Sequence, residues 1–236
     1  MALDWVQLSE NHSNLNYVSV DFSLNSPGIF IYQEETNEYH FISYIKEGQG
    51  TKKERAWQED ISHLKGVTLI NQPDWGKQGA DYSSVELAKI KRYAKTADDI
   101  INLITDITKT KKQYIISFEG TSFGSKMGTN NIIDMAAGAA ILKERMLSQL
   151  EILDIQTIAP TTIKKHAGKG NMNKSQLWDA FLSNVLGDQV LAEHPLLDFC
   201  VKEIGPSKKI PKPFDDLVDA YFLTHFVRAK MSAAVE

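Results

Sequence analysis

The first part of the chain consists of short apolar runs separated by turn residues, a pattern typical of β-strands. Residues 15–24 form the first run, and Asn25-Ser26-Pro27-Gly28 follows it as a turn. Ile29 to Tyr32 predicts a second strand that runs back along the first, and Tyr39 to Lys46 predicts a third. We therefore expect a β-meander at the start of the chain.

The later part alternates helical and strand-like patterns. Apolar residues recur at helical spacing from Ser83 to Thr108, and a strand-like run then ends at Glu119. The further elements expected are a helix over 129–149, a strand over 152–159, and helices over 174–187 and 214–230. Such alternation after an initial meander predicts an α/β fold, with a mixed sheet flanked by helices on both faces.

Residues 47–81 interrupt this regular pattern. The segment is polar and rich in glycine, and we interpret it as an insertion with little regular structure apart from a short helix near 53–64. No internal repeat and no low-complexity tail occurs along the chain. A single domain over residues 1–236 is the interpretation that follows.

Composition narrows the class of protein. The chain has 236 residues and is 42% hydrophobic, which is enough for one sizeable core. No apolar stretch approaches the roughly 18 residues of a membrane span, and the N-terminus lacks the basic start of a signal peptide. Cys200 is the only cysteine, so neither a disulfide framework nor a cysteine-based zinc site is expected. We expect a soluble protein of a reducing compartment.

Charge is unevenly distributed along the chain. The net charge of −4 does not by itself indicate nucleic-acid binding. The segment from Thr161 to Lys174 nevertheless contains no acidic residue and four lysines, at positions 164, 165, 169 and 174. This asymmetry is compatible with a basic face that binds phosphate, although an ordinary solvated loop is the alternative.

Four carboxylates stand at the ends of apolar elements. Asp21 and Glu119 each end a strand, while Asp216 and Asp219 lie three apart at the start of the C-terminal helix. Each one alone has a structural explanation, such as capping a turn or a helix. Several that converge on one point indicate hard cations such as Mg²⁺. Asp215 aligns with Asp219 at a spacing of four, so whether Asp215 or Asp216 is the ligand stays open.

Four carboxylates are about what a pair of magnesium ions requires. Two such ions roughly 3.5–4 Å apart activate a water and stabilise the leaving oxygen during attack on a phosphodiester. A nearby lysine would stabilise the charge of the transition state. The six histidines are scattered without metal-like spacing.

Four stretches, taken in order, resemble the RuvC family of Holliday junction resolvases, which have a ribonuclease-H-like fold. They are Val20-Asp21-Phe22-Ser23, Phe118-Glu119-Gly120, the segment from Ala159-Pro160-Thr161-Thr162-Ile163-Lys164-Lys165 to Gly168-Lys169-Gly170-Asn171-Met172-Asn173-Lys174-Ser175-Gln176, and Asp216-Leu217-Val218-Asp219-Ala220. The third stretch is the most specific of them.

The resemblance implies a homodimer that binds four-way DNA junctions and makes paired nicks with two Mg²⁺ ions, for which Mn²⁺ substitutes. By this analogy Asp21, Glu119, Asp216 and Asp219 would hold the metals, and Lys174 would lie near the scissile phosphate. The remaining residues expected to contact DNA are Lys164, Lys165, Lys169 and the stacking aromatic Phe123. Lys164 and Phe123 are each offset by about one residue from the family pattern.

Departures from the family pattern leave alternatives open. The chain between Asp21 and Glu119 is longer than in bacterial members, which suggests a diverged, viral or phage protein in a bacterial or phage-infected host cytoplasm. The insertion contains Lys52, Lys53 and Arg55, so it is either an extra DNA contact or a self-packed loop. A broader nuclease of flaps, forks and three-way branches, or a catalytically silent junction-binding protein, are the alternative functions.

Overall fold

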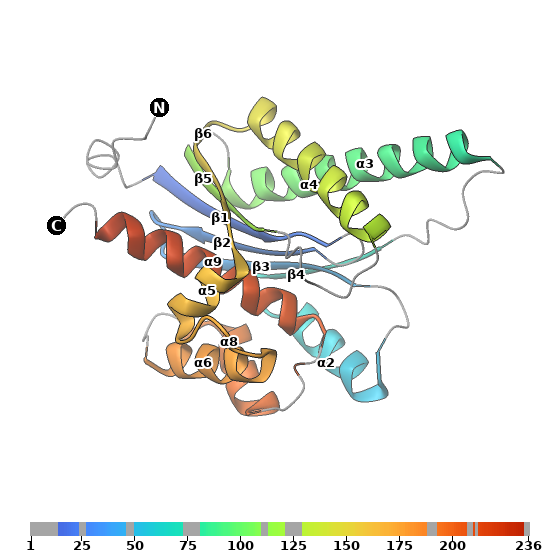
Figure 1. Ribbon diagram of the computed structural model, residues 1–236. Helices are drawn as coiled ribbons and strands as arrows, with labels where there is room; N and C mark the ends of the chain where they lie inside the picture. The colour runs from blue at the N-terminus through green and yellow to red at the C-terminus, as the bar shows by residue number, and fades with distance from the viewer. Residues whose placement is uncertain are drawn as a thin grey trace.

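A mixed sheet forms the centre of the molecule (Figure 1). The computed structural model describes residues 14–23, 27–45, 50–72, 81–109, 113–120, 129–187, 193–206, 210 and 212–233. Within these ranges the sheet has six strands in the order β4-β3-β2-β1-β5-β6. The strands are β1 (Leu15–Asp21), β2 (Gly28–Gln33), β3 (Glu38–Ile45), β4 (Val67–Asn71), β5 (Gln113–Glu119) and β6 (Ile152–Ile158).

The expected meander and the mixed sheet are both confirmed. β1, β2 and β3 pair antiparallel in sequence order. β5 pairs parallel with β1, β6 pairs parallel with β5, and β4 pairs parallel with β3. All of these strands except β2 therefore run in the same direction. Their C-terminal ends lie along one end of the sheet, where Asp21 and Glu119 are found.

Helices cover both faces of the sheet, as predicted (Figure 1). α3 (Tyr82–Thr108) and α4 (Thr129–Gln149) pack on one face. α9 (Phe214–Ser232) crosses the other face, and α5 (Pro160–Ala167) and α6 (Lys174–Gly187) pack against it. The further elements on this side are α2 (Lys52–Ser62), α8 (Pro195–Phe199) and a π-helical turn (Cys200–Ile204).

Alternate residues of the central strands pack into two separate hydrophobic cores, one on each face of the sheet. Tyr17 and Phe30 point toward α9, whereas Val18 and Ile29 point toward α3 and α4. β1 and β2 are therefore buried on both sides, which explains why apolar residues occupy both faces of each strand. Trp178 and Tyr221 are the largest fully buried side chains of the core beneath α9.

The prediction of little regular structure in residues 47–81 is wrong for the described part of that segment. The expected short helix is present as α2, with a capping box between Thr51 and Glu54. Val67–Asn71 then adds β4 to the edge of the sheet. β4 was missed because it is only five residues long and only partly buried, so its apolar run is short.

A second difference concerns the lysine-rich segment after β6. The sequence pattern predicted no helix or strand between residues 160 and 173, but Pro160–Ala167 forms α5. Pro160 stands in the first turn of this helix, where the missing N–H removes no intrahelical hydrogen bond. Ile163 is the residue of α5 that is buried in the core. None of the helices in the described ranges has the length and apolar character needed to cross a bilayer.

Candidate metal centre

The pairing of β1 with β5 brings Asp21 and Glu119 together. Ser19 lies opposite Ser117 in this parallel pair. Side chains two residues apart in a strand share a face, so Asp21 and Glu119 emerge side by side at the ends of their strands. The predicted pairing of these two acids is therefore a direct consequence of the strand register.

A buried group of hydroxyls ties the C-terminal helix to these two strands. The Oγ atoms of Ser19 and Ser117 lie 2.6 Å apart, and Thr224 Oγ1 of α9 donates to Ser19 Oγ at 2.6 Å. All three residues are at most 2% exposed. Buried hydroxyls are costly when unpaired, so this contact fixes how α9 lies across β1 and β5. Sequence reasoning did not identify it.

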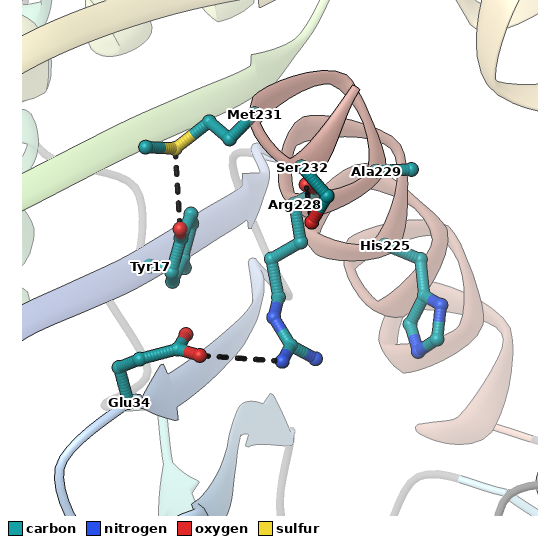
Figure 2. A pocket seen from close by; sticks show the side chains of 7 residues that line it. All are labelled: Tyr17, Glu34, His225, Arg228, Ala229, Met231 and Ser232. Atoms are coloured by element: carbon teal, nitrogen blue, oxygen red, sulfur yellow. Dashed lines mark hydrogen bonds and ion pairs between the residues drawn. The ribbon is translucent and has the colours of Figure 1, made fainter. Parts of the chain in front are cut away.

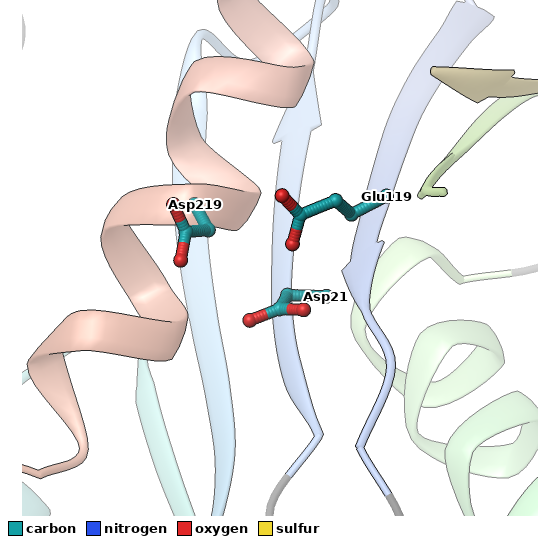
Figure 3. Close-up of side chains that lie close together, drawn as sticks. All are labelled: Asp21, Glu119 and Asp219. Carbon is teal, nitrogen blue, oxygen red and sulfur yellow. The ribbon is translucent and has the colours of Figure 1, made fainter. Parts of the chain in front are cut away.

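α9 supplies the third carboxylate of the centre. Asp219 faces Asp21 and Glu119, and each residue offers an oxygen within 4.8 Å of the others (Figure 3). Three carboxylates at this separation form a set of hard oxygen donors, which suits Mg²⁺ or Mn²⁺ and not a soft cation. The donor set therefore fits the divalent metal that the sequence predicted.

Without a cation these acids suppress one another's ionisation. Burial raises the pKa of Asp21 well above its usual range, and the charges of Glu119 and Asp219 raise it further. A hydrogen bond in which protonated Asp21 donates to Glu119 adds to this effect. Burial raises the pKa of Glu119 as well, and burial together with Glu119 raises the pKa of Asp219 to about 7. Metal-free protein therefore holds protons where a cation would bind.

Asp216 lies next to the centre but contacts a lysine. Both of its carboxylate oxygens lie 2.6 Å from the Nζ of Lys212, and the residue is 5% exposed. Its charge still contributes to the raised pKa of Asp21. The predicted role of Asp216 as a metal ligand stays a prediction, because the described cluster within 4.8 Å contains only Asp21, Glu119 and Asp219.

Asp215 points toward the lysine predicted to lie near the phosphate. Lys174 Nζ lies 2.8 Å from Asp215 Oδ2, and Lys212 Nζ lies 3.2 Å from Asp215 Oδ1. Burial lowers the pKa of Lys174, but Asp215 and the nearby acids Asp219 and Asp216 outweigh this and leave the pKa raised. Lys174 is therefore charged at neutral pH and lies at the rim of the centre.

The other predicted DNA contacts differ in how close they come to the acids. The charge of Lys164 in α5 reaches Glu119 and opposes the rise in its pKa. Lys165 in α5 and Lys169 between α5 and α6 are both exposed. Phe123 lies outside the described residues.

Sequence reasoning missed two residues that shape the centre. Lys212 stands four residues before Asp216 but in the turn that precedes α9, so helical spacing does not predict this pair. Gly28 pairs with Asp21 across β1 and β2, and a Cβ added at Gly28 would lie 2.8 Å from the backbone of Asp216. Only glycine allows α9 to begin so close to the sheet.

A pocket of about 400 Å³ lies at the other end of α9, away from the carboxylates (Figure 2). The Cζ atom of Arg228 lies 3.7 Å from the ring centre of Tyr32, and its Nη2 atom lies 3.7 Å from Oε1 of Glu34. Tyr17 donates to the sulfur of Met231 at 3.1 Å. These contacts join α9 to the start of β1 and the end of β2, so we assign this pocket a structural role.

Comparisons with known proteins support the fold. No family model matches the chain, and no curated protein matches it by sequence. The crystal structure of the yeast mitochondrial Holliday junction resolvase Ydc2 matches with a TM-score of 0.53 and 8% identity, over 98% of this chain and 85% of that one. Thermus thermophilus RuvC matches with a TM-score of 0.47 and 12% identity, over 92% and 96% of the two chains. The same protein in complex with a Holliday junction substrate matches with a TM-score of 0.47, 10% identity and the same coverage.

The match to Ydc2 shows that this chain has the fold of a RuvC-like resolvase. It covers nearly the whole chain, so it includes all the elements that carry the three carboxylates. The expected ribonuclease-H-like class is confirmed. At 8% identity the match carries the fold alone, and the activity has to be argued from the site.

Proposed function

We propose that this protein is a metal-dependent, structure-selective DNA endonuclease that resolves four-way junctions by paired nicks. The observation that carries the proposal is the group of three carboxylates within 4.8 Å of one another at the ends of β1 and β5 and on α9. Such a group is unfavourable in a folded protein unless cations bind it. In a resolvase-like fold, cation-assisted hydrolysis of a phosphodiester is the chemistry that this group suits best.

Asp21, Glu119 and Asp219 would hold the cation directly, with Asp216 as the candidate ligand for a second one. Bound Mg²⁺ or Mn²⁺ would supply Lewis acidity at the scissile phosphate and a water of lowered pKa. The backbone around these acids is fixed by the sheet and by the Ser19–Ser117–Thr224 contact, so their positions are set before any ligand binds.

Lys174 is suited to stabilise negative charge on the phosphate. Its side chain is 64% exposed although its Nζ contacts Asp215, so the ammonium is accessible to a DNA strand. Its raised pKa keeps it charged at neutral pH. Developing charge in the transition state is best stabilised by a cation that is already in position.

The side of the molecule around α5 and α6 would bind the DNA backbone. Lys165 and Lys169 are exposed there, and Lys164 lies near enough for its charge to reach Glu119. Phosphate contacts of this kind make binding strongly dependent on salt. Specificity would then come from the shape of the branch, because these lysines contact the phosphate backbone and do not distinguish one base from another.

A homodimer is the proposed assembly, because paired nicks require two centres. α4 presents an exposed stripe of apolar and small residues at helical spacing, formed by Ile133, Ala136, Ala137, Ala140 and Leu147. Leu87 and Ile90 of the adjoining α3 are also more than half exposed. Small residues allow two helices to approach closely, and an exposed apolar surface of this kind indicates an interface.

The direct test compares a synthetic four-way junction, a flap and a linear duplex, each with Mg²⁺ and with EDTA. We expect metal-dependent nicks confined to the junction. Equal cutting of flap and junction would replace the proposal with a general branch nuclease. Tight junction binding without any cutting would leave a silent junction-binding protein.

A further inference from the structure

The ammonium of Lys212 lies against the buried carboxylate of Asp216. Its Nζ is 2.6 Å from each carboxylate oxygen of Asp216, so the ammonium sits between the two oxygens as a bidentate metal ion would. Asp216 is buried, whereas the side chain of Lys212 is 50% exposed. The acid is therefore fixed, and the lysine has solvent into which it can move.

Lysines and aspartates alternate around this point. Lys212 bridges Asp216 and Asp215, and Lys174 contacts the other oxygen of Asp215. Two positive and two negative charges thus form a neutral group beside the three-carboxylate cluster. Within the described ranges no lysine or arginine lies within ion-pair distance of Asp21, Glu119 or Asp219.

We propose that Lys212 is a displaceable counter-ion for a second divalent cation site at Asp216. The inference rests on the proposed function only in that these acids bind divalent cations. The first cation binds the cluster of Asp21, Glu119 and Asp219, where no lysine or arginine of the described ranges has to be displaced. The second cation binds Asp216 only after the Lys212 ammonium has left, so the two sites fill in order and with unequal affinity.

Electrostatics sets the direction of the effect. The ammonium of Lys212, held 2.6 Å from the oxygens of Asp216, repels a second cation at that carboxylate. The repulsion is strong because the distance is short and the site is partly shielded from water. The first site lies farther from Lys212, so it is affected less. DNA can assist the exchange, because a backbone phosphate offers the released ammonium a new partner.

The test counts bound Mn²⁺ by electron paramagnetic resonance in DNA-free protein, with Mg²⁺ titrated by calorimetry in parallel. The wild type should bind one ion tightly and a second about tenfold or more weakly. Lys212→Met should tighten the second ion about tenfold and the first by much less. Lys202→Met is the matched control, since Lys202 also pairs with an aspartate four residues away, at 2.8 Å from Asp198.

Asp216→Asn separates this account from a purely structural role of the ion pair, and it also serves if Lys212→Met does not fold. It should lose the second ion and keep the first. The inference is overturned if Lys212→Met binds both ions as Lys202→Met does, or if Asp216→Asn still binds two ions. Because no DNA is present, these outcomes are independent of whether the wild type cuts a junction.

Discussion

At the scale of single residues, the proposed metal site would link the binding of cations to the binding of protons through Asp219. Burial and the charge of Glu119 raise its pKa to about 7. A divalent cation binds the ionised carboxylate, so it must displace this proton near neutral pH. Asp21 and Glu119 have raised pKa values for the same reasons and add to the effect.

Cation affinity should therefore rise as the pH is raised from 6 to 8. Below the pKa of about 7 the Asp219 carboxyl is protonated and the cation competes with the proton. Calorimetric titration of the DNA-free protein with Mg²⁺ at pH 6, 7 and 8 measures this directly. An affinity that is constant or falls over this range would contradict the proposed ligand set.

The stability of the metal-free protein should change in the opposite direction. A carboxyl whose pKa is raised in the folded state stabilises the fold fully below its unfolded value of 3.8, and this contribution is lost as the pH rises through about 7. From pH 6 to 8, denaturation in EDTA should show a total loss of about 1.4 kcal/mol in the free energy of unfolding for this group, most of it below pH 7. Asp219→Asn should lose stability less steeply over the same range.

Part of the centre was predictable from residue type and position alone. Asp21 and Glu119 follow strand-forming runs, and parallel neighbouring strands necessarily place such residues together. Asp219 was predictable as a candidate because it lies three residues after Asp216 at the start of an apolar helix. Lys212 was not predicted, because nothing in the sequence says that this exposed lysine turns back onto Asp216. Phe123 stays a prediction.

At the scale of secondary structure elements, the contact between β2 and α9 sets the geometry of the centre. Gly28 lies opposite Asp21 in the sheet and directly under the backbone of Asp216. The start of α9 can approach the sheet because no side chain separates them. The distance from Asp219 to the strand carboxylates depends on this approach.

Gly28→Ala should push the start of α9 away from the sheet. The added Cβ would lie 2.8 Å from backbone atoms of Asp216, which cannot move independently of the helix. We expect a loss of about 1–3 kcal/mol in the free energy of unfolding, together with weaker cation binding. Chemical denaturation and Mg²⁺ calorimetry measure the two effects.

Gly187→Ala is the control for this substitution. It makes the same change at the end of α6, where nothing lies within 4 Å of the added carbon. It should leave stability and cation affinity nearly unchanged. Equal behaviour of the two variants would show that the Gly28 contact does not position α9.

Long, strongly patterned elements were predictable, whereas the short elements β4 and α5 were not. α3 spans 27 residues with regular apolar spacing, and its predicted bounds of 83–108 differ from Tyr82–Thr108 by one residue. α5 has eight residues, and Ile163 is its one fully buried side chain, so no periodicity was visible among its lysines. Its helical form depends on packing against α9, which is tertiary information.

At the scale of the whole molecule, the candidate centre combines side chains from the sheet and from the helices on one of its faces. The ends of β1 and β5 supply Asp21 and Glu119 and α9 supplies Asp219, while α5 and α6 supply exposed lysines beside them. The overall charge of −4 conceals this arrangement. α4 lies on the opposite face of the sheet, so dimerisation through it would leave both centres open to DNA (Figure 1).

Ile133→Asp should convert the proposed dimer into a monomer. Ile133 is 61% exposed in the apolar stripe of α4, and a charge there would have to be buried in the interface. Light scattering coupled to gel filtration measures the mass. Asn102→Asp, an equal charge change at an exposed position of α3, should stay dimeric. A wild type that is monomeric at all concentrations and on junction DNA would exclude this assembly.

The most direct test of the central claim uses a supercoiled plasmid with an extruded cruciform, incubated with wild-type protein and with Asp219→Asn. Paired nicks within one binding event give linear plasmid, whereas single nicks give an open circle. We predict linear product from the wild type with Mg²⁺, none with EDTA, and none from Asp219→Asn, which should still bind the junction. Cutting by Asp219→Asn at the wild-type rate, or cutting by the wild type in EDTA, would contradict the assignment of the metal centre.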